Sequence, residues 1–204
     1  MNIYMQRSIV LSIHEVTCLY YFLSVPLVVH TMKILNRKEI LSLVQSGDLI
    51  IYPFDESCLS EITYDIKLAD EFVAIETHIT STIDPNNLDN VKRVEIKKDE
   101  VYLQPHGFIL GKSLEWIELP NDVLAMISGK SGLARLGIQV ETAYLLQPGH
   151  KGYVVLEINN RNLVPIKLRK NMRIAQLLFF KLDEPVRPYH EIGRFGVQRK
   201  IRIL

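Results

Sequence analysis

The chain has 204 residues, of which 48% are hydrophobic and 23% charged, and its basic and acidic residues nearly balance at a net charge of +1. This composition is typical of a globular protein with room for one ordinary domain. Proteins that bind nucleic acids generally carry a large basic excess or a basic stripe, and the sequence has neither, so we expect no nucleic-acid partner. Only two cysteines occur, Cys18 and Cys58, without a CxxC pair. This pattern argues against a disulfide framework and a cysteine-based zinc site, and it favours a cytoplasmic protein.

The first 31 residues differ from the rest of the chain. Residues 8–29 are largely apolar, but His14, Glu15 and Pro26 interrupt them. A transmembrane helix needs about 20 apolar residues with few charges, and a signal peptide needs a compact apolar run with a small-residue cleavage site. Three interpretations stay open: an added strand or helix that packs on the body, a stretch upstream of a true start at Met32, or a membrane anchor. We expect no membrane partner and treat residues 1–31 as an extension of unassigned role.

A short helix is expected directly after Met32. Asn36 can cap its first turn, and Glu39, three residues later, completes a capping box. The apolar residues of segment 40–44 fall on one helical face, and Gly47 ends the helix.

Short segments with alternating apolar residues make up most of the remaining chain, and turn residues separate them. The expected strands cover residues 49–52, 64–68, 94–96, 101–103, 108–110, 116–119, 124–127, 137–140, 153–158, 166–168 and 174–180. Many short strands at regular spacing, with almost no helical periodicity, are typical of a β-sandwich or β-barrel. No linker divides residues 32–204, which we expect to form one domain.

The segment Gly129–Arg135 (GKSGLAR) follows one of these strands. Its two glycines allow backbone N–H groups to approach an anion, Ser131 adds a donor, and Lys130 and Arg135 supply positive charge. The spacing is not that of a P-loop. A phosphate-binding loop and a plain glycine-containing turn both fit the pattern.

Residues 153–158 (YVVLEI) form an expected strand with a single charge. Period two places Glu157 on one face with Tyr153 and Val155, among apolar neighbours. A carboxylate in such surroundings has its charged form disfavoured and suits acid–base catalysis, whereas an exposed glutamate paired with a lysine is the structural alternative. The preceding stretch 142–150 contains a Pro-Gly pair and is expected to form a hairpin.

Zinc deaminases carry a His-or-Cys-x-Glu motif and a Pro-Cys-x-x-Cys motif, and the sequence has neither. Its six histidines are scattered, and none is paired at metal-ligand spacing. The sequence therefore predicts no metal held by protein side chains.

Taken in order, several segments resemble the dCTP deaminase branch of the dUTPase-like superfamily, over about residues 32–198. The matching stretches are LNRKEI (35–40), ITYDIKL (62–68), GKSGLARLG (129–137), GYVVLEIN (152–159), NMRIAQLLFF (171–180) and VRPY (186–189). The resemblance implies a mainly β fold, a distorted β-barrel or jelly-roll of the dUTPase-like type with a short N-terminal helix. It also implies a C-terminal arm over about residues 186–204 and a homotrimer with active sites at subunit interfaces.

The resemblance further implies hydrolytic deamination of dCTP to dUTP and ammonia without zinc, with Mg²⁺ bound only through the triphosphate. Glu157 would activate the attacking water, and Ser131 and Arg135 are the other catalytic residues that it implies. The substrate-binding residues that it implies are Lys130, Ser131, Gly132, Arg135, Ala143, Gln176, Tyr189, Arg194 and Gln198.

Some positions depart from the family pattern. Gln147 stands where an aspartate is common, and in dUTPases that aspartate activates the water that attacks the α-phosphate. Because a neutral amide cannot act as a base, we expect dUTP as the end product. The arm diverges over residues 194–198, and Lys130 replaces a usual arginine. Two alternatives therefore stay open: a non-catalytic or regulatory nucleotide-binding trimer, and a dUTP diphosphatase.

Overall fold

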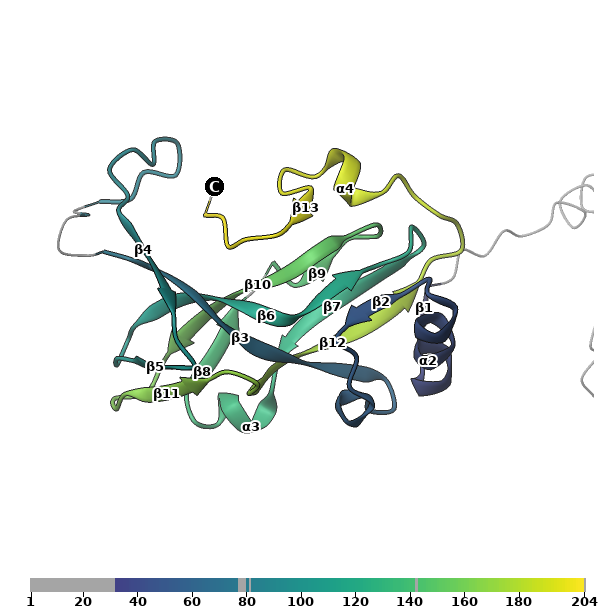
Figure 1. Ribbon diagram of the computed structural model, residues 1–204, viewed down its shortest axis with the longest axis horizontal. Helices are drawn as coiled ribbons and strands as arrows, with labels where there is room; N and C mark the ends of the chain where they lie inside the picture. Colours follow the sequence, from purple (N-terminus) through teal and green to yellow (C-terminus); the bar gives the residue numbers. More distant parts are fainter. Residues whose placement is uncertain (1–31, 77–79, 81, 142, 204) are drawn as a thin grey trace, which may run out of the picture. The chain divides into compact units, whose positions relative to one another are not determined.

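The computed structural model describes residues 32–203 apart from 77–79, 81 and 142 (Figure 1). The expectations for residues 1–31 lie outside the described residues. The elements, in chain order, are β1 (Lys33–Ile34), α2 (Arg37–Ser46), β2 (Ile50–Tyr52), the 3₁₀ helix η1 (Glu56–Cys58), β3 (Thr63–Ile75), β4 (Arg93–Lys97), β5 (Glu100–Leu103), β6 (Phe108–Glu118), β7 (Val123–Gly129), α3 (Ser131–Ala134), β8 (Ile138–Glu141), β9 (Leu145–Leu146), β10 (Lys151–Asn160), β11 (Ile166–Arg169), β12 (Arg173–Lys181), α4 (Tyr189–Ile192) and β13 (Val197–Gln198).

One large, curled sheet organises the described part of the chain. It contains eleven strands, and its longest path runs in the order β13-β10-β6-β3-β12-β7-β9. The strands β1, β2, β4 and β8 pair with β12, β6, β3 and β10, while β5 and β11 form a separate two-stranded sheet. Figure 1 shows the long strands crossing one another as the sheet curls. The mainly β, distorted-barrel fold expected from the sequence is therefore confirmed.

The expected helix is present as α2, and its ends follow the sequence signals. The side chain of Asn36 accepts a hydrogen bond from the Glu39 backbone N–H at 3.2 Å, and Glu39 Oε2 accepts from the Asn36 N–H at 3.1 Å. This capping box satisfies two of the free donors of the first turn. Gly47 ends the helix at φ +81°, in the left-handed region that favours glycine. Ile40 is fully buried and anchors the helix to the core.

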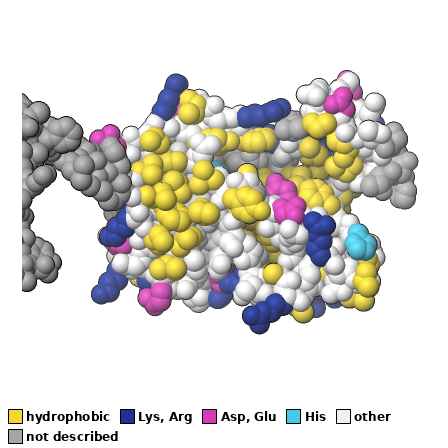
Figure 2. All heavy atoms as spheres, turned by 180° about the vertical axis from the view of Figure 1, so that it is seen from behind, with side chains coloured by type: hydrophobic (Ala, Val, Ile, Leu, Met, Phe, Trp, Pro, Cys, Tyr) yellow, Lys and Arg dark blue, Asp and Glu magenta, His cyan; other side chains and the backbone are white. Residues whose placement is uncertain are grey.

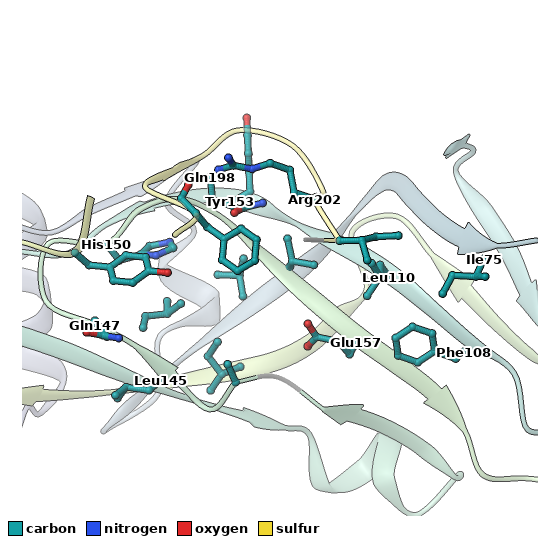
Figure 3. Close-up of a pocket in the computed structure, with 18 residues that line it drawn as sticks. Ile75, Phe108, Leu110, Leu145, Gln147, His150, Tyr153, Glu157, Gln198 and Arg202 are labelled. Carbon is teal, nitrogen blue, oxygen red and sulfur yellow. Dashed lines mark hydrogen bonds between the residues drawn. The ribbon is translucent and has the colours of Figure 1, made fainter. Parts of the chain in front are cut away.

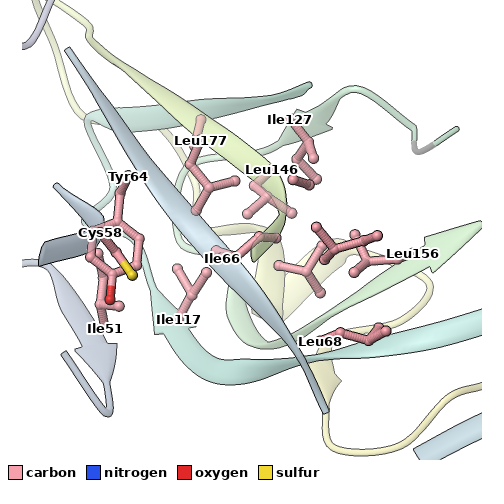
Figure 4. Packing of buried hydrophobic residues seen from close by; sticks show 14 of the residues in the cluster. Ile51, Cys58, Tyr64, Ile66, Leu68, Ile117, Ile127, Leu146, Leu156 and Leu177 are labelled. Carbon is pink, nitrogen blue, oxygen red and sulfur yellow. The ribbon is translucent and has the colours of Figure 1, made fainter. Parts of the chain in front are cut away.

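The core lies inside the curled sheet, where alternate residues of each strand meet (Figure 4). On β3, Tyr64, Ile66 and Leu68 have no exposed surface, because period two directs all three to the same face. On β10, Leu156 and Ile158 are buried in the same way, which leaves Glu157 facing the opposite side. The alternation expected around Glu157 is therefore confirmed, and it sets the direction of that carboxylate.

The strand β6 is longer than the sequence indicated, since we expected two strands, 108–110 and 116–119. The intervening polar residues stay in the strand because their side chains take over main-chain hydrogen bonds. Ser113 Oγ accepts from the Val154 N–H at 2.8 Å and donates to the Glu115 carbonyl at 2.8 Å. The pairing of β6 with β10 shifts register at this position, as in a β-bulge.

Glu115 is a buried charge-bearing residue of the same irregular region. It is 1% exposed, and its Oε2 accepts a hydrogen bond from the Lys67 N–H at 2.9 Å. Burial raises the pKa of this carboxyl from 4.5 to about 7. Glu115 does not line the pocket described below, so its role in the described structure is to bridge β6 and β3.

Candidate active site

A pocket with a volume of about 500 Å³ lies between β10, the segment around β9, and the C-terminal residues that follow α4 (Figure 3). Most of its wall is apolar, with contributions from Phe108, Leu110, Leu145, Leu146 and Phe195. The polar side chains among its lining residues are Gln147, His150, Tyr153, Glu157, Tyr189, Gln198 and Arg202. A mostly apolar cavity with a few polar groups is the usual form of a small-molecule site.

Glu157 points into this pocket from the middle of β10. Its Oε2 is buried and has no hydrogen-bond partner among the described residues. Burial, and secondarily the charge of Glu141, raise the pKa of the Glu157 carboxyl above its usual value of 4.5. A buried carboxylate without a partner is costly to a fold, and such groups are concentrated at functional sites. Glu157 can therefore accept and return a proton inside the pocket.

Glu141 is the cross-strand neighbour of Glu157, because the two residues are register partners on β8 and β10. Like charges in such a pair disfavour each other. Two groups hold the Glu141 carboxylate, one near the end of β10 and one directly after it: Asn159 Nδ2 donates to Oε2 at 3.2 Å, and a nitrogen of Arg161 lies 3.3 Å from Oε1. Glu141 thus has partners of its own, and Glu157 Oε2 has none.

The hairpin side of the pocket contains Ala143, Gln147 and His150. The turn at Pro148-Gly149 forms as expected, but its β9 strand is short and pairs with β7. His150 is 6% exposed, and burial lowers the pKa of its imidazole from 6.5 to about 4. The ring is therefore neutral near pH 7.

The C-terminal segment from Pro188 onward, which we call the arm, closes the pocket from the other side. It docks on the turn between β9 and β10: the Tyr189 N–H donates to the Pro148 carbonyl at 2.9 Å, and β13 pairs in parallel with Lys151 and Gly152. The contact is tight at Gly152, where φ is +142° and an added Cβ would lie 2.5 Å from the Gln198 carbonyl oxygen. A glycine is required here. The docked arm brings Tyr189 and Gln198 into the pocket wall.

The segment 129–135 lies elsewhere. Its residues form the end of β7 and the short helix α3, at the opposite end of the body from α4 and β13 (Figure 1). Lys130 Nζ is paired with Asp65 Oδ1 at 2.5 Å, and an Arg173 nitrogen lies 3.7 Å from Asp65 Oδ2. Gln176 is the register partner of Asp65 on β12, so it belongs to the same surface. We call Asp65, Arg173 and Gln176, together with the segment 129–135, the Lys130 cluster.

The expected site residues thus separate into two sets. Ala143, Glu157, Tyr189 and Gln198 line the pocket. The others are not among its lining residues, namely Lys130, Ser131, Gly132, Arg135, Gln176 and Arg194. Sequence reasoning also assigned no site role to most of the lining residues, among them His150, Tyr153, Phe195 and Arg202. Arg202 lies in a basic stretch near the C-terminus that also contains Arg194, Arg199 and Lys200. This stretch was the one sequence signal that could have indicated it.

Residues 34–182 match the family described as dCTP deaminase-like. The chain belongs to this family. A dCTP deaminase-like relative from Beutenbergia cavernae, named "dCTP deaminase, dUMP-forming", is 37% identical over 161 residues, which are 76% of this chain and 84% of the relative. A protein of the same name from Persephonella marina is 34% identical over 81% of this chain and 93% of its own length.

A solved structure supports the dCTP deaminase-like fold. The 2′-deoxycytidine 5′-triphosphate deaminase of Agrobacterium tumefaciens aligns with a TM-score of 0.59 at 22% identity, over 74% of this chain and 49% of that chain. This chain therefore spans about half the length of that protein. The curated relatives are named for forming dUMP, so the dUTP end product that we expected from Gln147 is not the product that their name states.

Two further observations concern the described residues of this dCTP deaminase-like chain. None of their helices is long and apolar enough to cross a membrane. No group of three or more His, Cys, Asp or Glu side chains is gathered there as a metal ion would require.

Proposed function

We propose that this protein catalyses the hydrolytic deamination of dCTP, with Glu157 activating the water. The observation that carries the proposal is the buried Oε2 of Glu157, which has no hydrogen-bond partner in the described part of the chain and faces a pocket of about 500 Å³. Membership of the dCTP deaminase-like family supports the choice of substrate. The mostly apolar wall suits a nucleobase, whose faces are apolar and whose edges are polar.

The chemistry follows from one carboxyl group. Glu157 takes a proton from water while the water oxygen bonds to C4 of the cytosine ring. This proton passes to the ring nitrogen N3. Glu157 then takes the proton of the new C4 hydroxyl and delivers it to the exocyclic amino group, so that the bond from C4 to this nitrogen breaks, the C4 carbonyl of uracil forms and ammonia leaves. The raised pKa of Glu157 suits this double role, because a group must both accept and release the proton near the working pH.

We propose that neither step uses protein-bound zinc, since the sequence lacks the zinc-deaminase motifs. Mg²⁺ would enter on the triphosphate. It prefers carboxylate, water and phosphate oxygens, and Glu157 is the single carboxylate among the pocket-lining residues that the structure describes. The lining residues therefore suit a metal carried by the substrate better than one held by the protein.

We propose dUMP as the end product, following the name of the relatives. Forming dUMP from dUTP takes a second hydrolysis, in which water attacks the α-phosphate and diphosphate leaves. The Gln147 amide lines the pocket but cannot take a proton from that water. Glu157 and the neutral imidazole of His150 are the lining groups that can.

We also propose a homotrimer whose sites are shared between subunits. One support is the position of the Lys130 cluster, because its cationic residues do not line the pocket of their own chain. A triphosphate needs such cations, and a neighbouring subunit can supply them across a head-to-tail interface.

The second support for a trimer is an apolar outer face on the sheet. Register partners on four strands place these side chains together on the surface away from the core: Ile34, Leu124, Met126, Leu145, Leu178 and Phe180. Ile34, Met126 and Leu145 are 44–47% exposed in the single chain. Figure 2 shows hydrophobic side chains gathered in the half of the body that holds β1, β7 and β12. Leu145 also lines the pocket, so the pocket borders this face.

A second candidate function is nucleotide binding without turnover, which Gln147 and the divergent arm favour. In either case we propose a cytoplasmic protein that acts on a free nucleotide rather than on nucleic acid or a membrane, in keeping with its net charge of +1.

Incubation of the protein with dCTP and Mg²⁺, with and without a zinc-selective chelator, tests these proposals. Ammonia release that the chelator does not change supports zinc-independent deamination. Chromatography then separates the products: dUMP with diphosphate supports the second step, and accumulated dUTP shows an enzyme that stops after deamination. Intact dCTP together with a raised melting temperature identifies a binder.

A further inference from the structure

The pocket is lined by few charged side chains, so each of them indicates which part of a substrate it could bind. Among the lining residues that the structure describes, Glu157 is the single carboxylate and Arg202 the single guanidinium or ammonium group. A nucleoside triphosphate carries several negative charges, and phosphate oxygens are bound in proteins mainly by such cations. Arg194, the arm residue that the family resemblance indicated, is exposed and does not line the pocket.

The Arg202 guanidinium is held in place by contacts that use only some of its N–H donors. Its Nη2 donates to the carbonyl oxygens of Phe195 and, at 3.3 Å, Val197. Its central carbon lies 5.7 Å from the centre of the Phe195 ring, as in a cation–π contact. Within the part of the chain that the structure describes, Nε and Nη1 have no acceptor. Two donors of a positioned, permanently charged group are thus available to an anion.

Arg202 and Glu157 belong to different walls of the pocket. Glu157 stands on β10, and Arg202 belongs to the arm that covers it, as Figure 3 shows. A nucleotide whose base meets Glu157 can therefore extend its phosphates toward the arm. We propose that Arg202 binds the phosphate groups of the substrate, an inference that rests on the proposed function and deepens it.

The test compares Arg202→Gln with the matched variant Arg199→Gln, which removes an exposed arginine of the same arm that does not line the pocket. For Arg202→Gln we expect the KM for dCTP to rise roughly 10- to 100-fold, the range of a charge-assisted hydrogen bond, with kcat little changed. For Arg199→Gln we expect the wild-type KM. Arg202→Lys should recover part of the loss, because it keeps the charge without the planar fork.

Ligand binding separates phosphate contact from a purely structural role of Arg202 in the arm. The dissociation constants of dCTP, dCMP and deoxycytidine are measured by calorimetry for Glu157→Gln and for Glu157→Gln with Arg202→Gln, which avoids turnover. The second change should weaken dCTP most, dCMP less, and deoxycytidine not at all. An equal loss for all three ligands would mean that Arg202 only holds the arm.

Two other results overturn the inference: a wild-type KM in Arg202→Gln, or an equal rise of the KM in Arg199→Gln. Failure of the proposed function is distinct, because the wild-type protein would then neither deaminate nor bind dCTP.

Discussion

The sequence suggested two sets of charged residues, one in the pocket wall around Glu157 and one in the Lys130 cluster. The two regions differ in whether their charged groups have partners of opposite charge. Glu157 Oε2 is buried and finds no hydrogen-bond partner among the residues that the structure describes, and its cross-strand register partner is another carboxylate. Lys130, by contrast, is paired with Asp65, which also attracts Arg173. The first arrangement disfavours the charged form, as is common at functional sites, whereas the second stabilises its charges.

This difference bears on how the Lys130 cluster could act. The Lys130 ammonium is held by Asp65, so it could bind a phosphate only in competition with that carboxylate. Arg135, one turn later, is exposed and forms no ion pair with another described residue. A substitution of Arg135 is therefore the better test of whether the cluster completes a site. A substitution of Glu157 is the better test of the proposed catalysis.

The largest effect is expected at Glu157. Glu157→Gln keeps the size of the side chain and removes the proton acceptor, so kcat should fall by about 10²- to 10⁴-fold. Binding of dCTP should persist, and ammonia release measures the loss. Glu95→Gln changes an exposed strand glutamate and serves as the control. Full turnover in Glu157→Gln would show that the unpartnered carboxylate is not the base.

Mixing subunits tests whether the two regions belong to one site. Glu157→Gln and Arg135→Ala should each be nearly inactive alone. If a site takes Glu157 from one subunit and Arg135 from its neighbour, an equal mixture refolded together restores about one quarter of the sites, by random pairing at a head-to-tail interface. Recovered ammonia release is the measurement. No recovery, with trimers seen in light scattering, would place both residues in one chain's site or exclude Arg135 from it.

A smaller effect is expected where the arm docks. Gly152→Ala puts a Cβ 2.5 Å from the Gln198 carbonyl oxygen and strains a positive φ by roughly 1–3 kcal/mol. The arm should dock less often, the KM for dCTP should rise, and limited proteolysis should cleave the arm sooner. Gly129→Ala is the control for proteolysis, since nothing lies closer than 3.9 Å to its added Cβ. Unchanged protection in Gly152→Ala would contradict the docked arm.

The smallest effect is expected at Glu141. Its charge is the secondary cause of the raised pKa of Glu157, after burial. Glu141→Gln favours the ionised form of Glu157 and so lowers its pKa. The acid limb of the kcat/KM profile should therefore move to lower pH. Glu141→Asp keeps the charge and should leave the limb near its wild-type position, while an unmoved limb in both variants would show that the two carboxylates do not interact.

Local signals predicted the local structure well. Asn36, Glu39 and Gly47 marked both ends of α2, because capping depends on residues within one turn. Alternation placed Glu157 opposite the core, because period two is a property of the strand itself. The break expected inside β6 was wrong, since Ser113 replaces main-chain hydrogen bonds with its own hydroxyl, which a search for apolar alternation does not detect.

The composition of the site could be predicted only in part, because it depends on contacts between distant segments. Family resemblance identified Tyr189 and Gln198, and both line the pocket. It also indicated Arg194, but the arm's position is set by its docking against Gly149 and Gly152, and that docking brings Arg202 to the pocket. The spacing of residues along the chain predicts neither the docking of the arm nor the separation of the Lys130 cluster from Glu157.

Glu115, buried between β6 and β3, makes the folding stability fall as the pH rises, whereas the proposed base Glu157 needs a higher pH to be ionised. Its pKa is about 7 in the folded chain and near 4.5 when exposed, so folding favours the protonated form. The stability that it contributes is complete below pH 4.5 and is lost as the pH rises through about 7. Glu157, however, can act as a base only once it has lost its proton. We therefore expect acid to favour the stability of the fold and a higher pH to favour the proposed base, so that the pH range in which the protein is both folded and active would depend on both glutamates.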